Sequence, residues 1–137
     1  MALDECVSRK IRSMISRLDA TIARLEERYK ALYDKALFDC EKREYYKKEM
    51  QIIRDIAKQL MTVQAALELM HGEQQLYHEV LRELERMIKS IMPELAIELK
   101  ELENAAQAAT ITVASEADKL LEEIAAIAEE KMKLWGE

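Results

Sequence analysis

The residues that could hold a metal ion are two short steps near the middle of the chain. Glu68 and His71 are three residues apart, the spacing that di-iron helical bundles use on paired helices. The second step places Gln75, which has no carboxylate, before His78, so the ligand set is incomplete. We therefore interpret both histidines as ordinary surface residues and expect no metal and no cofactor. A ferritin-like metal bundle is the least favoured hypothesis, and metal analysis of the purified protein would test it.

The sequence also lacks the usual signs of a catalytic site. Its two glycines, Gly72 and Gly136, cannot form a glycine-rich phosphate loop. Its two histidines lie within eight residues of each other, and no set of nucleophile, histidine and acid is suggested. We predict no catalytic residue and a protein that is not an enzyme.

A basic run near the start of the chain is the strongest candidate for a binding surface. Residues 8–18 (SRKIRSMISRL) contain no acid and four cations: Arg9, Lys10, Arg12 and Arg17. Such a run can simply be a solvated helix face. The functional alternative is a contact with an anionic membrane, where each cation contributes about 1 kcal/mol. Aromatic residues do not alternate with these cations, so we expect no nucleic-acid partner.

Charge is divided unevenly along the chain. Residues 1–60 carry 14 Lys and Arg against 11 Asp and Glu, whereas residues 61–137 carry 7 against 16. A basic first half and an acidic second half attract each other. This division predicts a contact between the halves, either within one subunit or between neighbouring subunits.

The elements that carry these residues are predicted from apolar periodicity. Apolar residues recur every three or four positions over 7–36 and again over 46–70, which indicates two long amphipathic helices. Folded back about residues 38–40, the two stripes pair so that the numbers of facing residues add to 77–79 throughout. This constant register predicts an antiparallel hairpin with arms about 50 Å long. Its predicted core includes Ile11, Leu18, Leu25, Ile53, Leu60 and Leu67.

The rest of the chain is predicted to form shorter helices packed against the hairpin, an all-α asymmetric bundle. We expect a helical core over 1–108, with helices at about 4–37, 41–70, 73–92 and 93–108. Gly72 is the candidate hinge or helix stop, and Pro93 fits the first turn of the fourth helix. A linker over 109–115 is predicted to precede an acidic regulatory helix over 116–137. Leu121 and Ile124 lie on the apolar face of this last helix.

Composition and cysteine placement are typical of an intracellular long-helix protein. Half of the 137 residues are hydrophobic and 35% are charged, with two Gly and one Pro. Cys6 and Cys40 are expected at opposite ends of the first arm, too far apart to pair. No apolar run reaches the roughly 20 residues needed to cross a bilayer, and no signal peptide is seen. We expect a cytoplasmic protein, and a plain coiled-coil adaptor or scaffold without membrane activity is an open alternative.

Three segments resemble the ESCRT-III family, most closely its archaeal Cdv cell-division branch. They are residues 18–37 (LDATIARLEERYKALYDKAL), 43–68 (REYYKKEMQIIRDIAKQLMTVQAALE) and 88–103 (IKSIMPELAIELKELE). The second segment matches the family pattern at Tyr46, Glu49, Ile53, Arg54, Asp55, Ala66, Leu67 and Glu68. The third matches at Met92, Pro93, Glu94, Glu98 and Leu99. The resemblance covers about residues 8–103, and 115–133 is compatible with the family's regulatory fifth helix.

The resemblance implies a subunit that polymerises with itself or with paralogues on the inner face of the membrane, at the division site. It implies that the four cations of residues 8–18 face lipid and that the acidic C-terminal helix keeps the monomer closed. Some relatives also bind a disassembling AAA ATPase. The proline-rich motif used for that contact is absent here, as is a winged-helix extension, and Asp118–Lys133 resembles the helical ATPase-binding motif only faintly.

Overall fold

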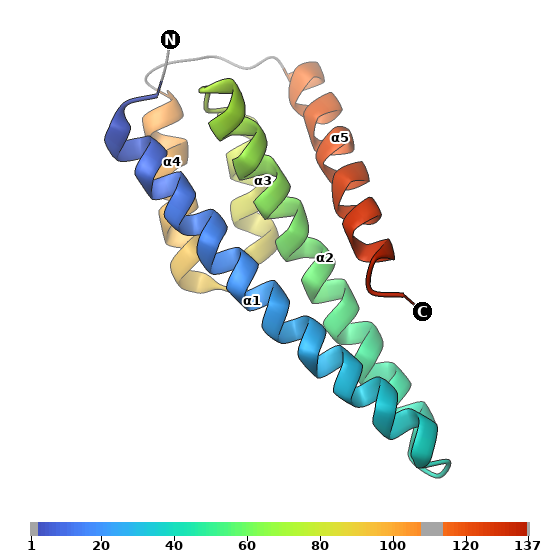
Figure 1. Ribbon diagram of the computed structural model, residues 1–137. Helices are drawn as coiled ribbons and strands as arrows, with labels where there is room; N and C mark the ends of the chain where they lie inside the picture. Colours follow the sequence, from blue (N-terminus) through green and yellow to red (C-terminus); the bar gives the residue numbers. More distant parts are fainter. Residues whose placement is uncertain (1–2, 108–113, 137) are drawn as a thin grey trace.

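The computed structural model describes residues 3–107 and 114–136, which form five helices (Figure 1). These are α1 (Glu5–Phe38), α2 (Arg43–Glu73), α3 (His78–Ile88), α4 (Pro93–Gln107) and α5 (Ala114–Lys133). The helices α1 and α2 form one long antiparallel hairpin, and the three shorter helices pack against it near the chain's N-terminus (Figure 1). The predicted all-α asymmetric bundle is confirmed.

The register of the hairpin follows from its two apolar stripes. Arg43 contacts the carbonyl of Ala36, and Gln64 contacts the carbonyl of Ile15, so both pairs of numbers add to 79. Most residues of the two stripes are buried between the arms. Of the predicted hairpin core, Ile11, Leu18, Ile53, Leu60 and Leu67 are buried, and Leu25 is partly buried.

Local signals set the helix boundaries. The side chain of Asp4 accepts a hydrogen bond from the backbone N–H of Val7 at 2.9 Å, so Asp4 is the N-cap of α1. The helix α4 begins at Pro93, whose fixed φ and missing N–H suit a first helical position. Arg43 at the start of α2 donates from Nε to the carbonyl of Ala36, one of the last carbonyls of α1.

The centre of the bundle is the second half of α2. All eight residues from Leu60 to Leu67 are buried, although an amphipathic helix would bury only one face. The reason is that α1, α3 and α5 all pack against α2 in this part of the molecule (Figure 1). Towards the tip, α1 and α2 continue as a two-helix extension beyond α3 and α4 (Figure 1).

The junction between α2 and α3 differs from the prediction. The helix α2 runs through Gly72 to Glu73 and ends at Gln74, which adopts a left-handed conformation with φ 55°. The N–H of Gln75 then donates to the carbonyl of Met70, as in a helix-terminating turn. Gly72 is therefore not a helix stop, and a hinge role for it is still a prediction.

The helix α3 is shorter than the predicted 73–92. It begins at His78, after an extended Tyr77, because the left-handed turn at Gln74 has ended the previous helix. It ends at Ile88, and residues 89–91 form turns ahead of Pro93, which disfavours a helical residue before it. Of the predicted linker over 109–115, residues 109–113 lie outside the described residues, and 114–115 already belong to α5.

Candidate functional site

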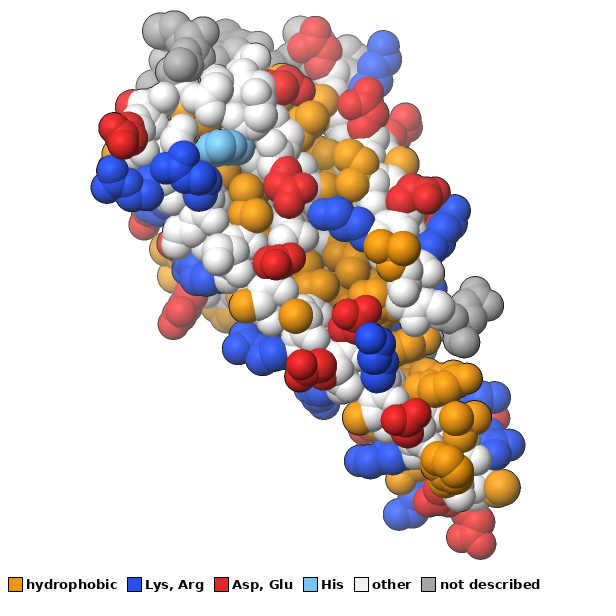
Figure 2. Space-filling view, viewed as in Figure 1, with side chains coloured by type: hydrophobic (Ala, Val, Ile, Leu, Met, Phe, Trp, Pro, Cys, Tyr) orange, Lys and Arg blue, Asp and Glu red, His pale blue; other side chains and the backbone are white. Residues whose placement is uncertain are grey.

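The cations of α1 form two groups on different sides of the buried seam. At about 100° per residue, Lys10, Arg17, Arg24, Arg28 and Lys35 fall within an arc of about 40°. We call these five residues the basic stripe; it is about 38 Å long at 1.5 Å per residue. In Figure 2, Lys and Arg side chains recur along the edge of the molecule that α1 follows. The stripe is encoded by a spacing of 7, 7, 4 and 7 residues, a signal that the continuous basic run over 8–18 does not reveal.

The four basic residues predicted to face lipid therefore do not share one face. Lys10 and Arg17 belong to the basic stripe, whereas Arg12 points about 140° away from it. Arg9 is exposed and pairs with Glu5 on its own helix at 3.4 Å. Residues that are consecutive in the sequence point in different directions on a helix, because each residue is rotated by about 100° from the one before it. The basic run over 8–18 therefore contributes to two separate surfaces.

Acidic residues of α4 cover the first two cations of the basic stripe. Both carboxylate oxygens of Glu98 lie 2.8 Å from guanidinium nitrogens of Arg17, a two-pronged ion pair. The hydrogen bond to Glu98 raises the pKa of Arg17, and the charge of Glu94 adds to this effect. Nearer the start of α1, the amine of Lys10 contacts Glu101. The predicted contact between basic and acidic halves is thus made here by α1 and α4.

The acidic helix α5 lies along α2 instead. Lys58 of α2 contacts Glu129 of α5 at 2.9 Å, and Lys131 of α5 contacts Glu68 of α2 at 3.7 Å. On its apolar face Ile124 is fully buried, and Leu121 is half-buried. Both residues predicted for the regulatory helix therefore pack in or against the bundle core, and a regulatory role for them is still a prediction.

The residues that follow α5 extend this contact to the first arm. The ring of Trp135 lies 5.4 Å from that of Tyr29, tilted by 49°, and Trp135 is buried. Arg54 of α2 donates to the carbonyl of Gly136 at 2.9 Å, and its other contact is the hydroxyl of Tyr29 at 3.4 Å. Since α5 and these terminal residues touch both arms, α5 cannot leave the hairpin without exposing Trp135.

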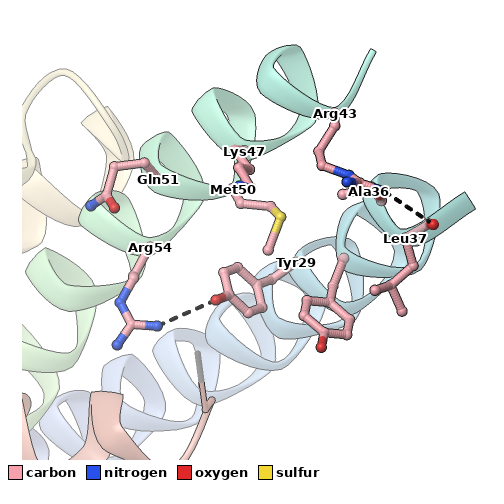
Figure 3. Close-up of a pocket in the computed structure, with 9 residues that line it drawn as sticks. Tyr29, Ala36, Leu37, Arg43, Lys47, Met50, Gln51 and Arg54 are labelled. Atoms are coloured by element: carbon pink, nitrogen blue, oxygen red, sulfur yellow. Dashed lines mark hydrogen bonds between the residues drawn. The ribbon is translucent and has the colours of Figure 1, made fainter. Parts of the chain in front are cut away.

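A cavity of about 390 Å³ opens between the two arms beside this contact (Figure 3). The side chains of Tyr29 and Met50 project into the space between the arms, and the Arg54 guanidinium reaches the Tyr29 hydroxyl (Figure 3). Nearer the tip, Arg43 bridges to the end of α1 (Figure 3). The rest of the lining is Tyr33, Ala36, Leu37, Lys47 and Gln51.

Apolar side chains are also exposed around the hairpin tip. Phe38 at the end of α1 is 87% exposed, and four more large apolar residues of this region face solvent: Tyr33, Leu37, Tyr45 and Ile52. Figure 2 shows hydrophobic side chains gathered near the tip. Exposed apolar surface of this kind is typical of a protein contact.

Two residues of the incomplete ligand set, Glu68 and His78, are engaged in other contacts. No group of three or more His, Cys, Asp or Glu side chains that could hold a metal gathers within residues 3–107 and 114–136. Glu68 is engaged by Lys131 of α5. His78 is not the surface residue that we expected, since its ring lies between Glu79 and the buried Glu103 of α4, 3.3 Å from each. It joins α3 to α4.

Cys6 and Cys40 are both exposed thiols at opposite ends of α1. In the part of the chain that the structure describes, no helix is long and apolar enough to cross a membrane.

Comparison with known proteins shows a similarity to a cell-division protein. Cell division protein B1 of Sulfolobus acidocaldarius is 34% identical to this chain, and the alignment covers 90% of the chain and 72% of the relative. No protein-family model matches the sequence, and no solved structure matches it. The likeness extends over nearly all of the chain, so it includes the hairpin and the shorter helices.

Proposed function

The chain belongs to the archaeal Cdv cell-division branch of the ESCRT-III family, and we propose that it is a filament subunit that polymerises on membranes to remodel or sever them during cell division. Its place of action is then the inner face of the membrane at the division site. The main observation in favour is the long hairpin whose first arm carries a basic stripe, with α4 against the first part of that stripe and α5 along α2.

The shape of the hairpin suits lateral assembly. Two rigid arms present a long side to a neighbouring subunit, and apolar residues at the tip such as Phe38 and Tyr45 add surface for protein contact. The partners in this proposal are further copies of the chain or its paralogues, together with an anionic membrane. An AAA ATPase that disassembles the filament is a further candidate partner, for which the described residues show no dedicated motif.

In this proposal α5 restrains assembly. It covers α2 and, through Trp135, touches the first arm, so a neighbour cannot reach this side of the hairpin while α5 is docked. Release of α5 and the residues after it frees Lys58 and Glu68 of α2 and uncovers the ring of Tyr29. Residues 116–137 are therefore assigned the role of an acidic regulatory helix.

The test is negative-stain microscopy of the protein with anionic vesicles at low and high salt. Filaments or tubules at low salt, reduced at high salt and on neutral vesicles, are the expected result, because screening weakens exposed charge contacts. The same assay on the chain lacking 114–137 should give more assembly. Bare vesicles and dispersed protein at both salts, with the shortened chain as well, would refute the membrane polymer.

A coiled-coil adaptor is the second candidate function. The exposed apolar residues at the hairpin tip favour it, because they suit a protein partner and need no lipid. The two functions separate in one comparison: an adaptor binds neither neutral nor anionic vesicles at any salt, and remains dispersed when α5 is removed.

A further inference from the structure

The cavity near the hairpin tip combines aromatic and cationic side chains. Tyr29 and Tyr33 of α1 line it, and Met50 of α2 projects toward Tyr29 (Figure 3). None of its described lining residues is Asp or Glu, and the charged ones are all cations: Arg43, Lys47 and Arg54. In a chain whose net charge is −6, this lining selects an occupant that has both an apolar group and negative charge.

The corner that joins the two arms carries the complementary chemistry. Phe38 ends α1, and its side chain is 87% exposed. Asp39 and Glu41 follow it in the turn, and Glu41 is exposed. An aromatic ring beside two carboxylates is the kind of occupant that the cavity selects. The chain therefore carries both halves of one contact.

Phe38 lies on the wrong side of α1 to fill the cavity of its own chain. At about 100° per residue it is rotated by about 140° from Tyr33 and by about 180° from Tyr29 around the helix axis. Moving its ring into the cavity of another molecule would remove apolar surface from water. A second copy of this chain therefore fits as the occupant.

We propose that Phe38 of one copy enters the tip cavity of a second copy. Asp39 and Glu41 of the first copy then face Arg43 and Lys47 of the second. This inference rests on the proposed function, since it names one contact of the proposed assembly. The two surfaces in contact are different, so the contact is head-to-tail and leaves the second copy's own Phe38 free for a third copy.

The cavity is open while α5 is docked. The described residues after α5 meet the lining at its end nearest the bundle, where Trp135 lies on Tyr29 and Arg54 donates to the carbonyl of Gly136. Tyr33 and Lys47 lie nearer to the tip and are exposed. The tip contact is thus available before α5 leaves the hairpin, and it joins subunits that are still closed.

The first experiment measures association of the full chain without vesicles, by sedimentation velocity over a range of concentrations. F38A should raise the dissociation constant about tenfold, because the ring is the main buried group of the contact. Ile97 of α4 is 62% exposed and lies outside the tip, so I97A should change the constant at most about twofold. Equal losses in the two variants, or a chain that is monomeric at every concentration, would overturn the proposal.

The second experiment exchanges charges across the contact. E41K and K47E should each weaken association about fivefold, and E41K/K47E should restore it to within about twofold, because both partners then carry the reversed charges. Lys48 is exposed and rotated by about 100° from Lys47, so E41K/K48E should stay weak. Single substitutions without effect, or equal recovery in the two double variants, would show that Glu41 does not meet Lys47.

The third experiment tests the direction of the contact by cross-linking with a short bismaleimide. C6S leaves Cys40, two residues after Phe38, as the natural thiol. Q51C adds a thiol at the cavity, and Q59C adds one at an exposed position about 12 Å farther from the tip. C6S/Q51C should form covalent dimers and larger oligomers, whereas C6S/Q59C and C6S alone should remain monomers. Covalent dimers in C6S alone would mean that two tips meet symmetrically, which overturns the head-to-tail contact.

Failure of this inference differs from failure of the proposed function. If F38A leaves filaments on anionic vesicles unchanged and the chain is monomeric without vesicles, the function stands and the tip contact does not. If F38A weakens association but no form of the chain assembles on vesicles, the tip contact stands and the membrane polymer fails. If F38A lowers vesicle affinity but not association, the tip meets lipid, and the second copy is the wrong occupant.

Discussion

Arg43 shows how a single side chain closes the hairpin. Its Nε donates to the carbonyl of Ala36 at 2.8 Å, and Nη2 approaches the carbonyl of Leu37 at 3.5 Å. These carbonyls belong to the last turn of α1 and have no partner within that helix. The bond from a charged donor therefore joins the end of α1 to the start of α2 across a turn that has no glycine.

Replacing Arg43 by methionine should destabilise the protein. We expect the free energy of unfolding to fall by about 1 to 2 kcal/mol, the range for losing hydrogen bonds from a charged, half-buried donor. Urea denaturation followed by circular dichroism measures the change. Lys48 is exposed on the same helix, so K48M serves as the control and should change stability by less than about 0.5 kcal/mol. Equal effects of the two substitutions would contradict the role given to Arg43.

Because of Tyr77, the free energy of unfolding should fall as the pH becomes alkaline. Burial, followed by its hydrogen bond to Glu73, raises the pKa of Tyr77 from 10.0 to about 12. Below pH 10 the phenol is protonated in both folded and unfolded chains, so its full contribution is present. Between about pH 10 and 12 the unfolded chain loses the proton first, which favours unfolding.

The measurement for Tyr77 is the free energy of unfolding at about pH 9 and about pH 11, on either side of the ordinary phenol pKa, compared between the unmodified chain and Y77F. Loss of stability over this interval should be smaller in Y77F, because phenylalanine has no proton to lose. The exposed Tyr33 provides the control, since Y33F leaves the Tyr77 phenol in place. An identical pH response in all three proteins would show that the Tyr77 proton does not contribute.

At the scale of elements, α5 is a separable helix whose docking can be followed optically. Trp135 is the only tryptophan of the chain, and it is buried against Tyr29. Its fluorescence therefore reports whether the end of α5 rests on the hairpin. The buried Ile124 and the 42% exposed Ile127 lie about one turn apart on this helix and offer a matched pair of positions.

Placing aspartate at Ile124 should release α5, because the buried site would hold an unpaired charge. We expect the emission of Trp135 to shift to longer wavelength in I124D, while far-ultraviolet circular dichroism keeps most of its helical signal. In I127D the same charge faces solvent, and the emission should not change. If the emission of Trp135 in I124D stays at the wavelength of the unmodified chain, Ile124 is not needed to dock α5.

The α3–α4 pair is a second element packed on the hairpin. Its two helices are joined by a tight turn before Pro93, and His78 of α3 lies 3.3 Å from the buried Glu103 of α4. Its contacts with α1 include the ion pairs of Lys10 and Arg17. Charge thus contributes to how α4 meets α1, whereas the buried apolar face of α5 contributes most to how α5 meets α2.

At the scale of the whole molecule, the hairpin has two regions of different thickness. Around Leu60–Leu67 it is surrounded by further helices, but near Tyr33 and Tyr45 it consists of two helices alone. A helix amide is protected from exchange with solvent in proportion to the packing that must break before it opens. The two regions should therefore differ in local stability.

Hydrogen exchange measured by mass spectrometry should show this difference directly. Peptides from 57–70 are expected to exchange at least about tenfold more slowly than peptides from 30–50, because opening the former disrupts α1, α3 and α5 contacts together. Removal of 114–137 should speed exchange in 57–70 and leave 40–50 unchanged. Uniform exchange along both arms would mean that the hairpin opens as one unit.

Several features of the fold were accessible from the sequence because they depend on neighbouring residues only. Steps of three and four between apolar residues predict the long helices, and two matching stripes predict their antiparallel register. Asp4 and Pro93 mark helix starts through local backbone chemistry. The family resemblance, confirmed by the relative from Sulfolobus acidocaldarius, rests on the same helical patterns.

The end of α2 and the start of α3 were not accessible in this way. Gly72 was the expected stop, but Gln74 takes the left-handed conformation, which is uncommon for a residue with a side chain. Packing of Met70 and Leu76 in the core holds this turn in place. Tertiary contacts here outweigh the local preference of glycine, and a single sequence does not contain that information.

The two long helices, their register and the sign of charge on each half follow from the type and spacing of residues along one chain. Which charges meet was visible only in the folded molecule, where α4 lies on Lys10 and Arg17 and α5 lies on α2. Such contacts depend on shape and charge across elements that are far apart in the sequence.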